Sequence, residues 1–524
     1  MRRFFETVPA ILAWLTLILM FALSRFLPVW ISIFIILFDI YWLLKTVFLS
    51  FHLRATFMEM KKNMKVDWLA ELEKLKVESK KSNVGEVEEK KTFNFQFSTF
   101  HLVQDWRDIQ HLIILPMYNE PYEVVRESFM RLAAAHYPKD RMAVVLALEE
   151  RAGVSARETG DRIKEEFKDT FREFLVTIHP KDLAGEIPGK GSNESWAGAQ
   201  AKREIVDPSG IPYDHILVSV FDVDTQILPE YFSRLTYVFL TAKEPLRAIY
   251  QPVPLFTNNV YESGAFARVV SFSCTFWQMM QQSRPERLTS FSSQSIPFQT
   301  LAEIGFWQKD IVSEDSRIFW QGFFHYHGDF RTEPLFFPVA MDAPTAPTFW
   351  GTLKNIYKQQ RRWAWGSENV PYLLEGFQKD KTIPKKKRWY WTFNAIEGYH
   401  SWATNALMIF ALGWLPLFLG GQHYNETLLS YNLPHITRFI ISLSMIGVAS
   451  SAILSILLLP PRKEKLRIGD YGIYILQWLL MPLTLTVFGA FPGLEAQTRL
   501  ALGGKWRLGF WVTPKGRKGS VPHD

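Results

Sequence analysis

The sequence predicts an α/β domain with a mostly parallel sheet, joined to membrane-spanning and interface helices. From residue 110 onward, short apolar runs alternate with helical patterns, which is typical of parallel strands linked by helices. Apolar runs long enough to cross a bilayer flank this region on both sides. Charged residues still make up 21% of the 524-residue chain, more than a chain that is membrane throughout would carry. A soluble domain and membrane helices are therefore expected together.

Two apolar runs open the chain, at residues 8–23 and 29–51. The first run has a charged start and also fits a cleaved signal peptide. Because the second run follows almost at once, a hairpin of two transmembrane helices within residues 1–53 explains both. Residues 54–95 are highly charged, and we expect an amphipathic helix at 54–77 followed by a solvated linker.

The soluble domain is expected over residues 96–388. Its apolar runs are short and bounded by polar segments, as buried strands are. In a parallel sheet of this kind, ligands bind at the carboxyl ends of the strands. The expected strands are residues 111–116, 142–148, 174–178 and 216–221, and the expected helices are residues 122–136 and 157–173.

Residues 389–491 form a second hydrophobic region. It should begin with an aromatic-rich interface helix at 389–400 and continue with transmembrane helices at 402–420 and 436–459. The loop between these two transmembrane helices has no Lys or Arg, whereas the loop after them has four basic residues. By the positive-inside rule, the second loop and the soluble domain are cytoplasmic.

Residues 471–491 are long enough to span the bilayer, but Pro482 interrupts them. A full crossing would place the basic residues of the tail, 492–524, on the outer side, against the charge rule. We therefore expect a broken, re-entrant or interface-lying segment that returns the tail to the cytoplasm. The chain would be a multi-pass protein of the plasma or inner membrane, with the lipid bilayer as a partner.

Composition excludes several classes of function. The single cysteine, Cys274, rules out an internal disulfide and any multi-cysteine metal site. The net charge of +7 suits an anionic membrane surface or anionic ligands. Zinc-finger spacing and a recognition-helix signature are both missing from the sequence, so nucleic acid is not an expected partner.

A D-x-D motif, Asp222 and Asp224, follows the expected strand at 216–221. Side chains two residues apart on a strand point the same way, so both carboxylates could hold a divalent ion, Mg²⁺ or Mn²⁺. In an enzyme that releases a diphosphate, such an ion would neutralise the charge of that leaving group. The alternative is an Asp-rich loop or helix cap, since D-x-D is common by chance.

Five further motifs follow one another along the chain, and their order with D-x-D resembles that of membrane-embedded family 2 glycosyltransferases, the cellulose, hyaluronan and chitin synthase group. The resemblance runs from about Leu112 to Lys515. It implies a GT-A-like, Rossmann-like domain that transfers a sugar with inversion from a nucleotide-sugar such as a UDP-sugar. The motifs are P-x-Y-N-E at 116–120, G-K-G at 189–191, S-E-D at 313–315, Q-x-x-R-W at 359–363 and F-x-V-T-x-K at 510–515.

The resemblance also assigns the donor site. The alternatives are a turn at a helix N-terminus for 116–120 and a glycine-rich surface loop for 189–191. The sequence departs from the family at residues 149–150, where glutamates replace the usual aspartates and the longer side chains change reach. The donor-binding residues so implied are Pro116, Tyr118, Asn119, Glu120, Glu150, Lys190 and Asp222.

By the same resemblance, Asp315 is the general base, with Glu314 beside it, and it accepts the proton of the acceptor hydroxyl. Ser313 stands where the family commonly has threonine. The alternative is a solvated acidic turn that opens a helix.

Acceptor and diphosphate binding are assigned to Gln359, Arg362 and Trp363, with the tryptophan stacked on the acceptor sugar and the arginine near the diphosphate. An interface helix with a snorkelling arginine is the alternative. A gating loop that closes the donor pocket is implied at Phe510, Val512, Thr513 and Lys515. A basic tail that touches lipid headgroups is the alternative.

Three functions stay open. The favoured one extends a polysaccharide, although four firm spans are fewer than cellulose synthases use. The second moves one sugar to a lipid acceptor. The third, of another class, is a membrane transport or signalling protein with an inactive domain. The sequence leaves open the sugar, the linkage, and whether a homo-oligomer or an accessory subunit forms.

Overall fold

The computed structural model describes residues 1–82, 105–461 and 467–513. These residues divide into two compact units. The sheet unit contains Thr56–Asn258 and Gln281–Asp342, and the helical unit contains Met1–Ala55, Asn259–Met280 and Ala343–Thr513.

The sheet unit is built on one mixed, mostly parallel sheet of eight strands. Neighbouring strands from β3 to β4 are parallel, as are β6 and β8, whereas β7 and β5 run antiparallel to their neighbours. In sheet order the strands are β3 (Glu173–His179), β2 (Met142–Glu149), β1 (Gln110–Met117), β4 (Ile216–Val220), β7 (Ser295–Pro297), β6 (Ala248–Leu255), β8 (Arg331–Ala340) and β5 (Gln226–Ile227). The α/β fold class predicted from the sequence is confirmed.

Strands β1, β2 and β4 are nearly or fully buried along their length. Strands covered on both faces read as continuous apolar runs, which is why the sequence revealed them. The helices of this unit are α3 (Trp68–Ser82), α4 (Tyr122–Ala133), α5 (Gly153–Phe167), α6 (Lys190–Ala201), α7 (Asp207–Ser209), α8 (Tyr231–Thr241), α10 (Phe298–Glu303) and α11 (Glu314–His325).

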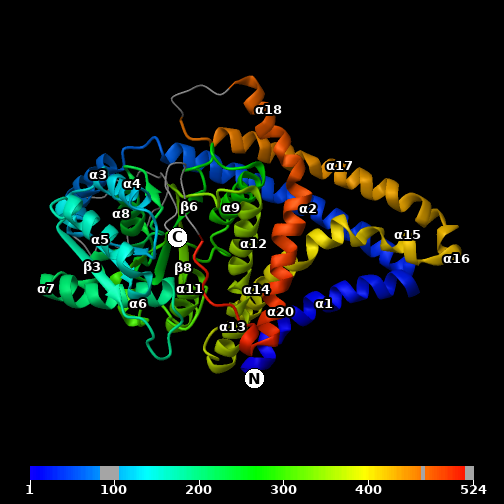
Figure 1. Ribbon diagram of the computed structural model, residues 1–524, viewed down its shortest axis with the longest axis horizontal. Helices are drawn as coiled ribbons and strands as arrows, with labels where there is room; N and C mark the ends of the chain where they lie inside the picture. The colour runs from blue at the N-terminus through cyan, green and yellow to red at the C-terminus, as the bar shows by residue number, and fades with distance from the viewer. Residues whose placement is uncertain (83–104, 462–466, 514–524) are drawn as a thin grey trace. The chain divides into compact units, whose positions relative to one another are not determined.

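The main core lies on one face of this sheet. Leu72 of α3, Phe129 of α4, Phe167 of α5 and Phe232 of α8 belong to one buried cluster together with alternate residues of β1 and β2. In Figure 1, α3, α4, α5 and α8 accordingly lie on one side of the strands and α6 on the other. Helices on both faces leave the carboxyl edge of the strands for ligands.

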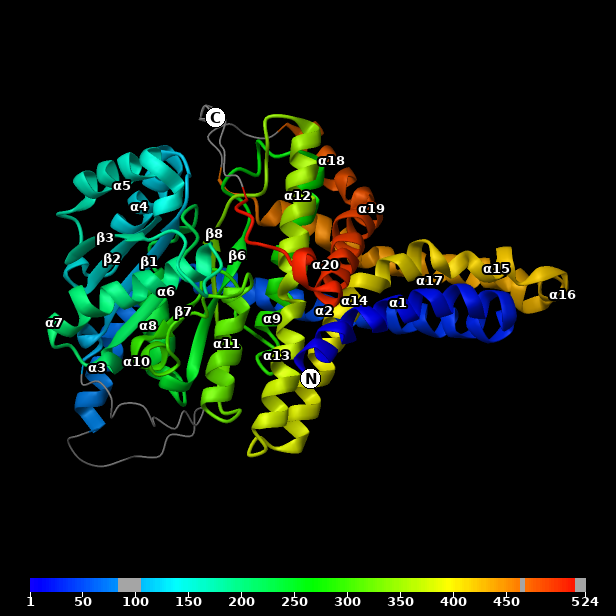
Figure 2. The ribbon, with the colours of Figure 1, turned by 60° about the horizontal axis from the view of Figure 1, so that its bottom comes forward.

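The helical unit contains α1 (Arg2–Phe26), most of α2 (Pro28–Asn63) and most of α9 (Ala265–Gln282). A buried cluster that includes Met20, Ile35, Met408 and Leu433 packs α1, α2, α14 and α17 together (Figure 2). The other helices are α12 (Phe349–Ala364), α13 (Asn369–Lys379), α14 (Lys385–Phe410), α15 (Leu415–Leu419), α16 (Gly421–Asn425), α17 (Leu428–Leu457), α18 (Ile468–Leu476), α19 (Met481–Leu485) and α20 (Phe491–Leu502).

Among the described residues, four helices are long and apolar enough to cross a membrane: Arg2–Phe26, Pro28–Asn63, Leu428–Leu457 and the run Ile468–Leu502. A bent pair, Lys385–Phe410 with Leu412–Leu419, would make a fifth span. In α17 only 17% of the apolar window is buried inside the protein. Such an uncovered apolar surface suits lipid.

The structure divides three helical segments differently from the sequence prediction. The helix expected at 54–77 is two helices, because α2 continues to Asn63 and α3 begins at Trp68. The interface helix and the following span are one helix, α14, and the chain then bends by 49° after Phe410. Residues 471–491, where a break was predicted, form a nearly continuous helical run. It contains a 3-10 turn at Gln477–Leu480 and a π turn at Thr486–Ala490.

The last helix, α20, ends at two glycines with left-handed backbone angles. Gly503 has φ 66° and Gly504 has φ 51°, a region that glycine adopts without strain. The chain then continues to Thr513 without a further strand or α-helix.

Candidate active site

The candidate site lies where β1, β2 and β4 end. Because these strands are parallel neighbours, Tyr118, Glu149 and Asp222 lie at or just beyond their carboxyl ends, at the same edge of the sheet. The chain goes from β1 outward to β2 and β3 on one side, and β4 lies on the other side of β1. This reversal of strand order is the place where ligands of open α/β sheets bind.

At the ends of β1 and β2, Arg151 joins Glu149 to the predicted donor-binding residue Tyr118. Arg151 donates to both oxygens of Glu149, at 2.6 and 3.1 Å, and its guanidinium lies 4.6 Å from the centre of the Tyr118 ring. Glu120 accepts a hydrogen bond of 2.8 Å from the Tyr118 backbone N–H. Arg151 was not predicted from the sequence.

Three further predicted donor residues lie at the same edge. Pro116 is in β1, and Asn119 is in the loop that follows it. Glu150 opens a short turn after β2 and accepts from the backbone N–H of Lys181 at 3.1 Å.

The D-x-D motif lies in a turn. β4 ends at Val220, and the backbone N–H of Thr225 donates to the Asp222 carbonyl at 2.8 Å, so strand alternation does not govern these two side chains. Asp222 accepts from the Ser292 hydroxyl at 2.8 Å and is 25% exposed. Asp224 is fully buried and accepts from the backbone N–H of Asp342 at 2.9 Å. The two carboxylates therefore have different surroundings.

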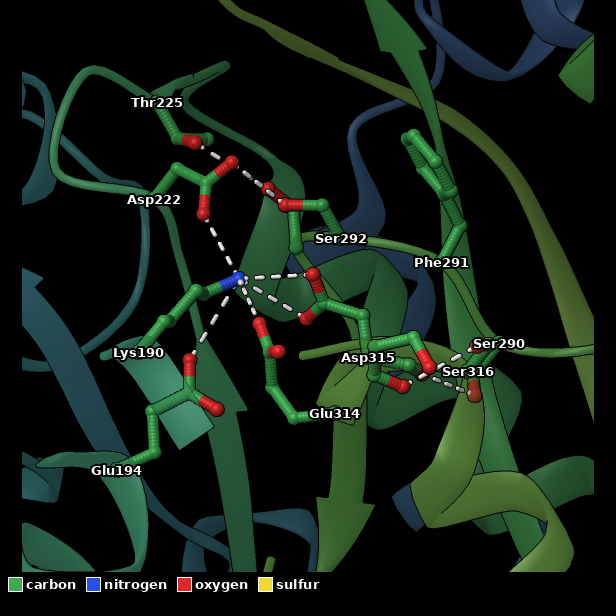
Figure 3. A network of polar contacts seen from close by, with 12 residues as sticks. Lys190, Glu194, Asp222, Thr225, Ser290, Phe291, Ser292, Glu314, Asp315 and Ser316 are labelled. Carbon is green, nitrogen blue, oxygen red and sulfur yellow. Dashed lines mark hydrogen bonds and ion pairs between the residues drawn. The ribbon is translucent and has the colours of Figure 1, made fainter. Parts of the chain in front are cut away.

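Lys190 lies at the centre of the acidic cluster (Figure 3). It is the first residue of α6, after Gly189 with φ 156°, and its side chain is only 9% exposed. Its ammonium contacts carboxylates from three separate segments. The Nζ distances are 2.8 Å to Asp222, 2.9 Å to both oxygens of Asp315, 3.5 Å to Glu194 and 3.8 Å to Glu314.

Glu314 and Asp315 are the first two residues of α11, where acidic side chains favour the positive end of the helix. The Ser290 hydroxyl donates to the Asp315 carbonyl at 2.5 Å and fixes this end of the helix. A Cβ on Gly191 would lie 2.9 Å from Cβ of Glu314, so glycine is needed for α6 and α11 to approach this closely.

Burial and the attraction of opposite charges shift the pKa values of the cluster in opposite directions. Burial alone would lower the pKa of Lys190, but the surrounding carboxylates, led by Asp222 and Asp315, hold the pKa well above its usual range. Glu194 is fully buried, and this burial raises its pKa well above the usual value despite the attraction of Lys190. The lysine is therefore charged near pH 7.

Sequence reasoning missed Glu194 as a member of the site. Its spacing of four residues after Lys190 was the available signal, because such pairs share one face of a helix.

The carboxylates of the cluster suit a divalent ion. One oxygen each from Glu194, Glu314 and Asp315 lie within 4.8 Å of one another. Carboxylate oxygens are the ligands that Mg²⁺ and Mn²⁺ prefer. In the described structure, the cation that these carboxylates surround is the Lys190 ammonium.

The helical unit brings the Q-x-x-R-W and F-x-V-T-x-K motifs together. The guanidinium of Arg362 lies 5.0 Å from the centre of the Phe510 ring, and Nζ of Lys358 lies 5.1 Å from that of Trp511. Gln359 and Thr513 are buried, and Trp363 and Val512 are half-buried. Lys515 lies outside the described residues.

A carboxylate holds α12 against α20 beside this contact. Glu495 accepts from Tyr357 at 2.8 Å and from Arg361 and Arg499 at 2.6 Å each. Two of these hydrogen bonds, from Tyr357 and Arg361, join α12 to α20, and the third lies within α20.

Fold and site together define an α/β domain that gathers acidic groups and a lysine at its strand ends, in a chain with membrane-capable helices. No protein-family model and no curated protein matches the sequence. Among solved structures, the chain is similar to the mannosyltransferase PcManGT from Pyrobaculum calidifontis, in complex with GDP-Man and Mn²⁺. The identity is 12%, the TM-score is 0.40, and the match covers 78% of this chain and 99% of that one. It is also similar to the fragment S. aureus TarS 1-349 in complex with UDP-GlcNAc, with 13% identity, a TM-score of 0.32, and 66% of this chain and 90% of the fragment covered.

Proposed function

We propose that this protein is a membrane glycosyltransferase of the family 2 kind, with a GT-A-like domain that transfers a sugar from a nucleotide-sugar to a growing polysaccharide. One observation carries the proposal: Lys190 contacts both Asp222 and Asp315, within 2.9 Å. Three motifs that lie far apart in the sequence thus form one charged site at the carboxyl edge of the sheet. Glycosyl transfer from a nucleoside diphosphate requires this combination of a cation for the diphosphate and a carboxylate base.

The donor would lie along the edge from β2 to β4. Its nucleoside would occupy the region of Tyr118, Glu120 and Glu150, and its diphosphate would extend to Lys190. A bound Mg²⁺ or Mn²⁺ would neutralise charge on the leaving diphosphate. The carboxylates that would hold the ion are Asp222 and Asp224 of the turn or Glu194, Glu314 and Asp315 of the cluster.

Asp315 would act as the base. Its side chain is 21% exposed, so an acceptor hydroxyl can reach it. The carboxylate takes the hydroxyl proton as the acceptor oxygen forms the new bond at the anomeric carbon and the bond to the diphosphate breaks. A single displacement of this kind inverts the configuration of the sugar.

The helical unit would bind the acceptor. Trp363 offers an aromatic face to a sugar ring, with Gln359 and Arg362 on the same helix, and the segment from Phe510 to Thr513 would close over the donor. The basic start of α14, Lys385 to Arg388, would face the cytoplasm, as would the sheet unit.

Transfer by purified protein in lipid nanodiscs tests the proposal, with a panel of radiolabelled nucleotide-sugars, Mn²⁺, and products sized on a gel. A ladder or high-mass polymer from one donor is expected. A single lipid-soluble product would replace polysaccharide extension by transfer of one sugar to a lipid. Absence of turnover with every donor would contradict the proposal and favour an inactive domain.

A further inference from the structure

The acidic cluster already holds a cation that belongs to the protein. Four carboxylates lie within 3.8 Å of the Lys190 ammonium, and two of them, Asp222 and Asp315, contact it at 2.8 and 2.9 Å. Figure 3 shows the ammonium in the middle of these four side chains. A divalent ion bound by the same oxygens would lie beside a charge of the same sign, which weakens its binding.

Glu194 gives a second, independent sign that the cluster can take a cation. Its side chain is fully buried, and neither of its oxygens has a hydrogen-bond partner among the described residues. Its nearest cation is Lys190, at 3.5 Å. Buried polar atoms of this kind are normally satisfied, so these oxygens are available to a ligand that enters the cluster.

We propose that Lys190 competes with the divalent ion for the acidic cluster, so that the ion binds tightly only after the diphosphate of the donor has drawn the ammonium away. A nucleoside diphosphate offers anionic oxygens, and lysine has a flexible stem that can turn toward them. Donor and metal would then bind together. The inference rests on the proposed function for the identity of the diphosphate, but the competition itself concerns only the residues of this chain.

Binding of Mn²⁺ alone to the full-length protein in nanodiscs, measured by electron paramagnetic resonance without nucleotide, tests the competition. Lys190→Met should bind Mn²⁺ at least about 10-fold more tightly than the unmodified protein, a difference of about 1.4 kcal/mol. Lys190→Arg keeps the charge and should stay within about 2-fold of the unmodified protein. Adding Glu194→Gln to Lys190→Met should reduce the gain.

Lys202→Met is the matched control, because Lys202 pairs with Asp207 at 2.8 Å on the surface of the same unit. It should leave Mn²⁺ affinity unchanged. Equal Mn²⁺ affinity of Lys190→Met and the unmodified protein, or equal gains in Lys190→Met and Lys190→Arg, would overturn the inference. A gain in Lys190→Met without sugar transfer by the unmodified protein would instead support the competition and contradict only the proposed enzyme activity.

Discussion

The sheet unit and the helical unit each join motifs that are distant in the sequence, but through different contacts. In the sheet unit, Lys190 meets Asp222 and Asp315 at 2.8 and 2.9 Å, in a buried setting. In the helical unit, Arg362 and Lys358 lie about 5 Å from the rings of Phe510 and Trp511. Buried ion pairs depend steeply on each charge, whereas cation–aromatic contacts are worth about 0.5–2 kcal/mol and tolerate change.

This difference teaches what each unit is suited to do. The sheet unit holds charges rigidly, as chemistry at one atom requires. The helical unit holds Phe510 and Trp511 by weaker cation–ring contacts at about 5 Å. The predictions below test this contrast, beginning with the largest expected effect.

Asp315→Asn should abolish transfer, by on the order of 10³-fold, because the amide cannot accept the hydroxyl proton. Nucleotide binding should persist, since the rest of the donor edge is intact. Turnover and nucleotide titration on the same sample check both. Asp310→Asn changes an exposed carboxylate five residues upstream and should keep activity. Equal loss of transfer and of nucleotide binding would contradict the assignment of Asp315 as the general base.

Gly191→Ala should destabilise the sheet unit by about 1–3 kcal/mol, the usual cost of overpacking. The new Cβ would lie 2.9 Å from Cβ of Glu314 and 3.2 Å from the Gln308 carbonyl oxygen. Gly398→Ala in α14 is the control, because no atom lies within 4 Å of its added Cβ. Thermal unfolding compares the two, and equal midpoints would show that α6 and α11 can move apart freely.

His111 lies near the amino end of β1, at the other end of the strand from the acidic cluster. Burial lowers its pKa to about 3, and it packs 4.6 Å from the Tyr137 ring. Below about pH 6.5 the unfolded chain binds a proton that the folded chain does not. Stability should therefore fall as pH falls from 6.5 toward 3, by up to about 1.4 kcal/mol per pH unit.

His111→Phe should flatten this slope in unfolding experiments between pH 7 and 4. His325→Gln, at a histidine that is 41% exposed, should not. Identical slopes in all three proteins would show that His111 takes up its proton without unfolding.

Trp363→Ala should have the smallest effect, about 0.5–1.5 kcal/mol or 2- to 10-fold, if it stacks on the acceptor sugar. Product length should shorten while donor hydrolysis is unchanged. Trp350→Ala is the control on the same helix, because Trp350 is 76% exposed. Unchanged product length in Trp363→Ala would assign Trp363 to the membrane interface instead.

Much of the sheet followed from the sequence because its central strands are buried on both faces. β6, β7 and β8 were not predicted, since proline and polar residues interrupt their apolar pattern. The bend after Phe410 was also missed. Gly413 lies close to the Met408 carbonyl, and Pro416 favours the start of a new helix, but neither residue reveals the bend alone.

The site was predicted in parts. The order of the motifs identified Asp222, Lys190 and Asp315 as separate candidates. Their proximity depends on how β4, α6 and α11 pack, which no local sequence pattern encodes. Glu194 was missed because a buried glutamate looks like a surface residue of an ordinary helix. Equally, no spacing revealed that Asp224 is buried and bound by the Asp342 backbone.

The glycines that end α20 mark the point from which the reach of the following segment can be calculated. With α20 held to α12 through Glu495, the segment beyond the helix begins at Gly503 and Gly504, both of which have positive φ. Phe510 is seven residues beyond Gly503, and an extended chain covers at most about 3.3–3.6 Å per residue. The Phe510 ring therefore lies within about 25 Å of the end of α20 in any conformation of this segment.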